Sequence, residues 1–195
     1  MRLNILEKTW VLNPVRRWAA EYFEVPKLLS LGGSLPGARV LDVGCGGGIW
    51  TPLIKRYFQA AHVDSLDLDS TMLRSASSRA EASIVGDACN LPFADERYDA
   101  VFSLQTLHHI EDWESSLCEM KRVLRPGGKI YGLETLANLL RHPFWGSWMT
   151  HPEDNRFSEE SFVLGLRGSG LQLEGVKRLG KWFLFFVATR VADKN

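Results

Sequence analysis

A glycine-rich stretch near the start of the chain constrains the fold more than any other feature. The apolar run Val40–Val43 has the composition of a buried strand, and glycine then fills four of the next five positions. Apolar residues resume with helical spacing from Ile49 onward. Glycine allows tight turns and lets a ligand touch the backbone, and amides at a helix N-terminus face a bound ligand. The order of strand, glycine loop and helix therefore predicts the opening of a nucleotide-binding α/β unit.

The spacing of these glycines indicates the kind of nucleotide. A dinucleotide fingerprint has glycine or alanine at its sixth position, but counting from Gly44 that position is Ile49. The stretch reads D-x-G-x-G-x-G instead, beginning at Asp42. In this pattern it resembles the class I S-adenosylmethionine-dependent methyltransferases, and within them the small type-11 methyltransferase domain. The resemblance implies that the Asp42 carboxylate holds the cofactor's ammonium, directly or through water, above a loop formed by Gly44, Cys45, Gly46 and Gly48.

Two further acidic residues follow, one βα unit apart. Asp67 lies 19 positions after Gly48 (67 − 48), at the end of a predicted strand, where a carboxylate can accept both ribose hydroxyls. Asp87 lies 20 positions further on (87 − 67), after another short strand. The family resemblance implies that Asp67 holds the ribose and that Asp87 accepts from the adenine amino group. It adds Leu68, Met72, Gly86 and Ala88 to the predicted cofactor site.

A fourth strand is predicted over Tyr98–Leu104, followed by a loop with two histidines. The carboxyl edge of an open α/β sheet carries the ligand crevice, and the resemblance places Ser103 and Leu104 near the methionine moiety. His108 or His109 could take a proton from an acceptor, because histidine titrates near neutral pH. The alternative is that one histidine packs or caps a helix and the other faces solvent. The loop lacks the Asn/Asp-Pro-Pro-aromatic tetrad of enzymes that methylate nucleic-acid bases.

Composition narrows the class of protein. The 195-residue chain has 23 basic and 23 acidic residues, which gives no electrostatic footprint for nucleic acid. Its three cysteines are widely spaced without a CxxC pair, as expected for free thiols in a reducing cytosol, and no metal-ligand spacing occurs. No signal peptide and no apolar run long enough to span a bilayer is found. We therefore expect a cytoplasmic protein without a transmembrane segment, whose oligomeric state stays open.

The remaining segments complete one predicted domain over residues 1–195. Residues 1–36 form an N-terminal helical arm, opened by Asn13 and Pro14, whose aromatic residues are expected to pack on the core; the alternative is that the arm closes over the substrate. Residues 38–135 form the cofactor-binding core. The aromatic-rich insertion at residues 136–157 is predicted to line an acceptor pocket, or else to form a surface helix with a buried aromatic face. Residues 158–195 supply a helix capped by Ser158 and two strands.

The family resemblance implies an α/β fold, a three-layer Rossmann-like sandwich with a seven-stranded, mostly parallel sheet and an antiparallel last strand. The predicted function is transfer of a methyl group from S-adenosylmethionine to a small-molecule acceptor, leaving S-adenosylhomocysteine. Two alternatives remain at this point: a nicotinamide-dependent oxidoreductase and a non-catalytic S-adenosylmethionine-binding protein. Replacing Asp67 by alanine is expected to weaken cofactor binding with little loss of stability.

Overall fold

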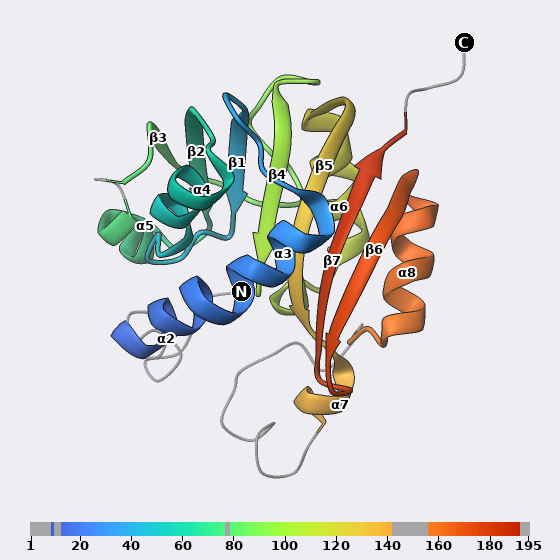
Figure 1. Cartoon of the computed structure of the whole chain (residues 1–195). Helices are drawn as coiled ribbons and strands as arrows, with labels where there is room; N and C mark the ends of the chain where they lie inside the picture. Colours follow the sequence, from blue (N-terminus) through green and yellow to red (C-terminus); the bar gives the residue numbers. More distant parts are fainter. Residues whose placement is uncertain (1–8, 10–12, 77–78, 142–155, 192–195) are drawn as a thin grey trace.

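One seven-stranded sheet organises the molecule (Figure 1). The computed structural model describes residues 9, 13–76, 79–141 and 156–191. The strand order is β3-β2-β1-β4-β5-β7-β6; β1 to β5 are parallel, and β7 runs antiparallel to both of its neighbours. The strands are β1 Arg39–Val43, β2 His62–Asp67, β3 Ala82–Val85, β4 Tyr98–Leu104, β5 Leu124–Thr135, β6 Leu171–Leu179 and β7 Phe183–Arg190. The predicted fold class is confirmed.

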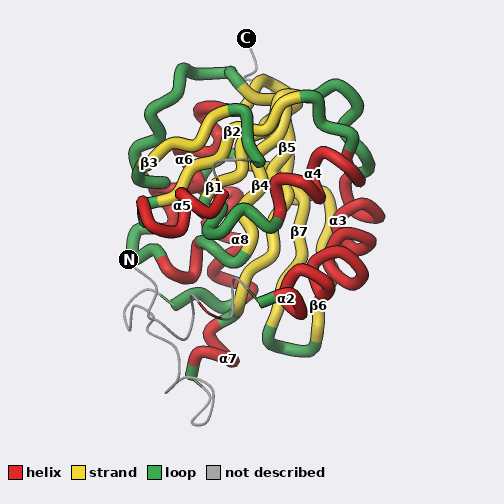
Figure 2. Tube along the Cα trace, turned by 90° about the vertical axis from the view of Figure 1, so that its left-hand side faces the viewer, coloured by secondary structure: helices red, strands yellow, loops and turns green. Residues whose placement is uncertain are grey.

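Helices cover both faces of this sheet, as Figure 2 shows from the side. The helical segments are α2 Pro14–Ala19, the π-helix η1 Ala20–Glu24, α3 Val25–Gly32, α4 Trp50–Phe58, α5 Ser70–Ala76, the 3-10 helix η2 Leu107–His109, α6 Trp113–Val123, α7 Ala137–Leu140 and α8 Glu159–Gly168. Helices α3 and α4 pack over one face around Leu28, Ile54 and Phe58. Helices α6 and α8 pack over the other around Leu117 and Phe162. Two buried clusters, one on each face, make the three layers.

The helix starts follow the local signals in the sequence. Asn13 caps α2, and its side chain accepts a hydrogen bond from Val15 N at 2.8 Å. Pro14, the next residue, is the first residue of the helix. Ser158 caps α8 by accepting from Ser161 N at 3.2 Å, with the rings of Phe157 and Phe162 4.9 Å apart beneath it. Since polar caps satisfy the free amides of the first turn, the predicted positions of these two helices are confirmed.

The N-terminal arm departs from the prediction. Its large apolar side chains were expected to pack on the core, yet those of Val15, Trp18, Tyr22 and Phe23 are all more than half exposed. The reason lies in the backbone: α2 ends at Ala19, the chain continues as a π-helix, and only α3 lies against β5, β6 and β7. In Figure 1, α2 extends beyond the sheet, below the carboxyl ends of the parallel strands. The arm buries Ala20, Val25 and Leu28 instead.

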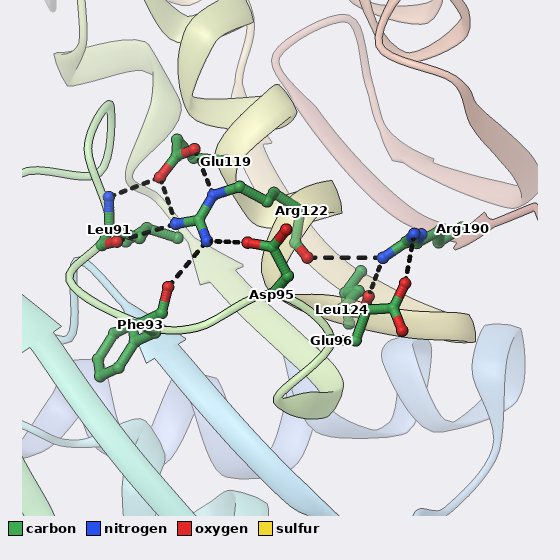
Figure 3. Close-up of polar contacts among 8 residues, drawn as sticks. All are labelled: Leu91, Phe93, Asp95, Glu96, Glu119, Arg122, Leu124 and Arg190. Atoms are coloured by element: carbon green, nitrogen blue, oxygen red, sulfur yellow. Dashed lines mark hydrogen bonds and ion pairs between the residues drawn. The ribbon is translucent and has the colours of Figure 1, made fainter.

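An arginine of α6 fixes the loop that follows β3 (Figure 3). Arg122 donates to the carbonyls of Leu91 and Phe93 at 2.9 and 2.8 Å, and pairs with the carboxylates of Asp95 and Glu119 at 2.6 and 2.7 Å. Glu119 also accepts from Leu91 N at 2.8 Å. The segment joining β3 to β4 is thus anchored to α6 by its backbone, close to the point where the sequence places adenine recognition.

Some predictions fall outside what the structure describes. Of the predicted acceptor insertion at residues 136–157, residues 142–155 lie outside the described residues, so its role remains a prediction. The division of the chain into arm, core, insertion and C-terminal segment also stays a prediction. Within the described ranges, no helix is long and apolar enough to cross a membrane.

Candidate functional site

The predicted cofactor residues meet at the carboxyl edge of the parallel strands. Strand β1 lies between β2 and β4, with Asp42 beside Ser65 on one side and Phe102 on the other, and Val43 beside Ser103. The last residues of three adjacent strands therefore lie next to one another. Ligands of open α/β sheets bind at such an edge, where the strand order reverses.

The glycine loop, residues 44–48, packs against the loop that follows β4. Gly44 N and Cys45 N donate to Leu66 O at 2.8 and 3.1 Å, which ties the loop to β2. Gly44 has φ +67°, and a Cβ on it would lie 2.3 Å from the Thr106 side chain. Thr106 Oγ1 in turn donates to Val43 O at 3.1 Å. Position 44 requires glycine both for its conformation and for this close approach.

Asp67 joins the glycine loop to the end of β2. Its carboxylate accepts from Gly46 N at 2.7 Å and from Asp69 N at 2.8 Å. Burial raises the pKa of Asp67, and these two N–H donors oppose the rise. A carboxylate has about four acceptor positions, so both oxygens can still accept from ribose hydroxyls. The contact with Gly46 was not predicted, and it gives Asp67 a structural part that the sequence did not reveal.

Asp42 is a buried carboxylate whose surroundings fit a bound cation. It is 2% exposed and accepts from Thr51 Oγ1 at 3.3 Å. Burial raises its pKa to about 7, and the negative charge of Asp67 adds to the rise. No ion pair joins Asp42 to a basic side chain in the described part of the chain. The ammonium of S-adenosylmethionine would supply the missing positive charge, so the residues present fit this cofactor.

The adenine side of the predicted site lies beyond β2 and β3. Asp87 is exposed, and its carboxylate accepts from Cys89 N at 2.9 Å. Gly86 N donates to Asp67 O at 3.1 Å, which brings the two predicted motifs together. Leu68 is 45% exposed at the same edge. The remaining predicted cofactor residues Met72, Ala88, Ser103, Leu104 and Cys45 are buried beside this edge.

One buried carboxylate beside the candidate site was missed by the sequence reasoning. Glu134 of β5 is fully buried, and burial raises its pKa to about 8, against the effect of backbone N–H donors. It accepts from the backbone N–H groups of Thr106, Leu107 and His108 at 3.3, 3.0 and 3.3 Å, and from Ser103 Oγ at 3.4 Å. Its Oε2 lies 2.7 Å from His108 Nδ1. The sequence offered one signal for Glu134: like Asp42 and Asp67, it is an acidic residue close to the carboxyl end of a strand.

The two candidate histidines have different surroundings. The His108 side chain is 5% exposed and contacts Glu134, whereas His109 is half-buried. Their ring centroids lie 4.3 Å apart. Because a buried ring held by a carboxylate has a fixed orientation, His108 is the better candidate for proton transfer.

A cleft of about 320 Å³ lies away from this site. It is lined by Asp95, Cys118, Lys121, Arg122, Ser169 and Arg190. Arg190 ends β7, which runs antiparallel, so the cleft opens at the amino edge of the parallel strands. Arg122 and Arg190 are bonded to carboxylates and carbonyls there (Figure 3). This arrangement stabilises the fold and shares no residue with the predicted cofactor site.

Comparison with known proteins finds methyltransferases among the proteins similar to this chain. Residues 41–132 match the methyltransferase domain family model. Malonyl-[acyl-carrier protein] O-methyltransferase of Methylococcus capsulatus is 38% identical over 113 residues, covering 53% of this chain and 41% of the relative. Demethylmenaquinone methyltransferase of Corynebacterium urealyticum is 39% identical over 95 residues, covering 49% and 40%. A solved methyltransferase of Aquifex aeolicus has TM-score 0.77 and 22% identity, over 97% of this chain and all of that one.

Over residues 41–132 the chain is therefore similar to a methyltransferase domain, and the curated relatives named above are methyltransferases. The curated matches span about two fifths of the length of those relatives. The similarity to the Aquifex protein, at 22% identity, concerns the fold.

Proposed function

We propose that this protein transfers the methyl group of S-adenosylmethionine to a small-molecule acceptor. The observation that carries the proposal is the meeting of Asp42, the glycine loop and Asp67 at the carboxyl edge of the sheet. The cofactor, when bound, supplies an activated methyl group on a sulfonium that is a good leaving group. The protein then has to hold the two reactants in line and exclude water, and such positioning can lower the barrier by about 7–11 kcal/mol.

Each polar residue of the site has a proposed part in holding the cofactor. Asp42 binds the ammonium, and amides of the glycine loop face the amino-acid end. Asp67 accepts from the ribose hydroxyls, with Leu68 against adenine, and Asp87 accepts from the adenine amino group. Asp67 already orders the glycine loop through Gly46 N at 2.7 Å, so ribose binding and loop geometry are coupled.

The acceptor is proposed to be a small molecule in the cytoplasm. The two curated relatives named above act, by their names, on a malonyl-acyl-carrier protein and on demethylmenaquinone. The two relatives both resemble this chain but act on different acceptors. The class of acceptor therefore has to be inferred from the residues of this chain itself. The balanced charge of the chain gives no support for nucleic acid as the substrate.

A turnover assay tests the proposal against its rival, a cofactor-binding protein without catalysis. The purified protein would be incubated with S-adenosylmethionine and a panel of phenols, thiols, enols, amines and fatty acids, with release of S-adenosylhomocysteine followed by mass spectrometry. We expect release to depend on one class of acceptor and to be lost in Asp67→Ala. Tight binding of S-adenosylhomocysteine without turnover of any acceptor would favour the non-catalytic alternative.

A further inference from the structure

Three backbone N–H groups, which can only donate, point at the Glu134 carboxylate. Oε1 accepts from Thr106 N, Leu107 N and Ser103 Oγ, and Oε2 accepts from His108 N. These donors stabilise an ionised carboxylate, which accepts hydrogen bonds and does not donate. The shortest contact, 2.7 Å to His108 Nδ1, then requires a proton on that nitrogen.

The backbone bonds explain how this contact is kept in place. Glu134 belongs to β5, whose neighbour β4 leads directly into the histidine loop. Three successive amides of that loop, from Thr106 to His108, point at one carboxylate. The same loop touches Gly44 through Thr106, so the ring is held at a fixed place relative to the glycine loop.

We propose that Glu134 is the positioning residue of the methyl-transfer site: it keeps Nδ1 of His108 protonated, so that Nε2 is the nitrogen that accepts a proton from the methyl acceptor. This inference rests on the proposed function for its catalytic part only. In a neutral imidazole one nitrogen donates and the other accepts, and the partner of the first decides which. His109, whose ring lies 4.3 Å away, is the other titratable group of the same loop.

The proposal names the chemical class of the acceptor. A base is needed only where the atom to be methylated carries a proton, as in a hydroxyl, a thiol or an acidic C–H group. In that step the proton moves to His108 Nε2 and the freed electron pair forms the bond to the methyl carbon. The electron pair of the carbon–sulfur bond stays on sulfur, which becomes a neutral thioether. A carboxylate acceptor would need no such base.

The assignment of the tautomer can be tested without any acceptor. Long-range ¹H–¹⁵N spectra of ¹⁵N-histidine-labelled protein report the proton on each ring nitrogen, and His108→Asn identifies the His108 signals among those of five histidines. We expect Nδ1 of His108 to be protonated and Nε2 unprotonated above neutral pH. A proton on Nε2 with Nδ1 bare would mean that Glu134 donates to the ring, and it would overturn the proposal.

Glu134→Gln tests the positioning itself. The glutamine side chain has one acceptor oxygen and one NH₂ group. The NH₂ group must therefore take the place of Oε1 or Oε2, where it faces groups that donate hydrogen bonds. Facing His108, the NH₂ group makes Nδ1 an acceptor and moves the ring proton to Nε2. We expect that exchange in the spectrum, and a kcat at least ~100-fold lower, with affinity for S-adenosylhomocysteine within about twofold. The matched control is Asp64→Asn, a 2%-exposed carboxylate that contacts Tyr98, Arg39 and Arg97 instead. It should leave the His108 signals unchanged.

His108→Asn separates base chemistry from loop structure if Glu134→Gln fails to fold. The asparagine amide can still donate to Glu134, but it has no second nitrogen to accept a proton. We expect kcat to fall ~100-fold while S-adenosylhomocysteine still binds. Unchanged kcat, or turnover that is restricted to carboxylate acceptors, would overturn the base role. Absence of turnover with every acceptor would count against the proposed function, while the nitrogen signals would still decide the tautomer.

Discussion

At the scale of single residues, Asp67 and Asp87 make different demands on the fold although both are proposed to bind the cofactor. Asp67→Ala removes two backbone hydrogen bonds, from Gly46 N and Asp69 N. It should lower the free energy of unfolding by ~1–3 kcal/mol as well as weaken S-adenosylhomocysteine binding. Asp87→Ala, at an exposed carboxylate bonded to Cys89 N, should weaken binding with less loss of stability. Urea unfolding and calorimetric titration of both variants measure this; equal stability losses would contradict it.

Asp42 makes the stability of the ligand-free protein depend on pH. Its pKa is raised from 3.8 to about 7, so between these values the folded state holds a proton that the unfolded state has lost. Stability therefore falls as pH rises through this window, by at most ~1.4 kcal/mol per pH unit. Urea unfolding should show that the free energy of unfolding decreases less between pH 5 and pH 7.5 in Asp42→Asn than in the unmodified protein. An equal decrease in both would exclude Asp42 as a source of the pH dependence.

At the scale of elements, the contact between the glycine loop and the β4 loop makes a sharp prediction for Gly44. Gly44→Ala places a Cβ 2.3 Å from Thr106, whereas Gly127→Ala, at φ +79°, meets nothing within 4 Å. Both variants carry the strain of a positive φ, about 1–2 kcal/mol. Only Gly44→Ala should also displace the loop and lose S-adenosylhomocysteine binding. Equal binding by both variants, measured calorimetrically, would show that the two loops are not coupled.

The anchoring of the β3–β4 segment to α6 gives a second prediction at this scale. Arg122→Ala removes bonds to two carbonyls and two carboxylates and should speed amide hydrogen exchange in residues 91–96 (Figure 3). Arg178→Ala is the control, because its exposed ion pair with Glu159 does not contact this segment, and pairs of that kind contribute little. Exchange rates that match those of Arg178→Ala would contradict the anchoring role.

The sequence predicted elements with strong local signals and failed where distant contacts decide. Tyr98–Leu104 was placed correctly because a short apolar run follows turn residues. The antiparallel direction of the last strand, β7, followed from the family resemblance and not from the residues themselves. Glu134 was missed because its partners lie 26 to 31 positions earlier in the chain. The exposure of Trp18 was mispredicted because helical spacing of aromatics does not reveal where the helix leaves the sheet.

At the scale of the whole molecule, the parts of the candidate site lie far apart in the sequence but share one edge of the sheet. The amino-terminal half supplies the carboxylates of β1 and β2, and the sheet continues through β4 and β5 to Glu134. Helix α2 lies below the same edge in Figure 1, and the side chain of its Trp18 is exposed. The proposed cofactor residues and the proposed proton-transfer residues thus lie at the ends of neighbouring strands or just after them, as a reaction between two bound molecules requires.

Calorimetric titration of the purified protein with S-adenosylhomocysteine, with NAD as the control, tests the central claim most directly. The carboxylates of Asp42 and Asp67 and the glycine loop should give micromolar binding of S-adenosylhomocysteine, which Asp67→Ala weakens, and no binding of NAD. Binding of NAD without binding of S-adenosylhomocysteine would contradict the assignment of this edge as a methyl-donor site.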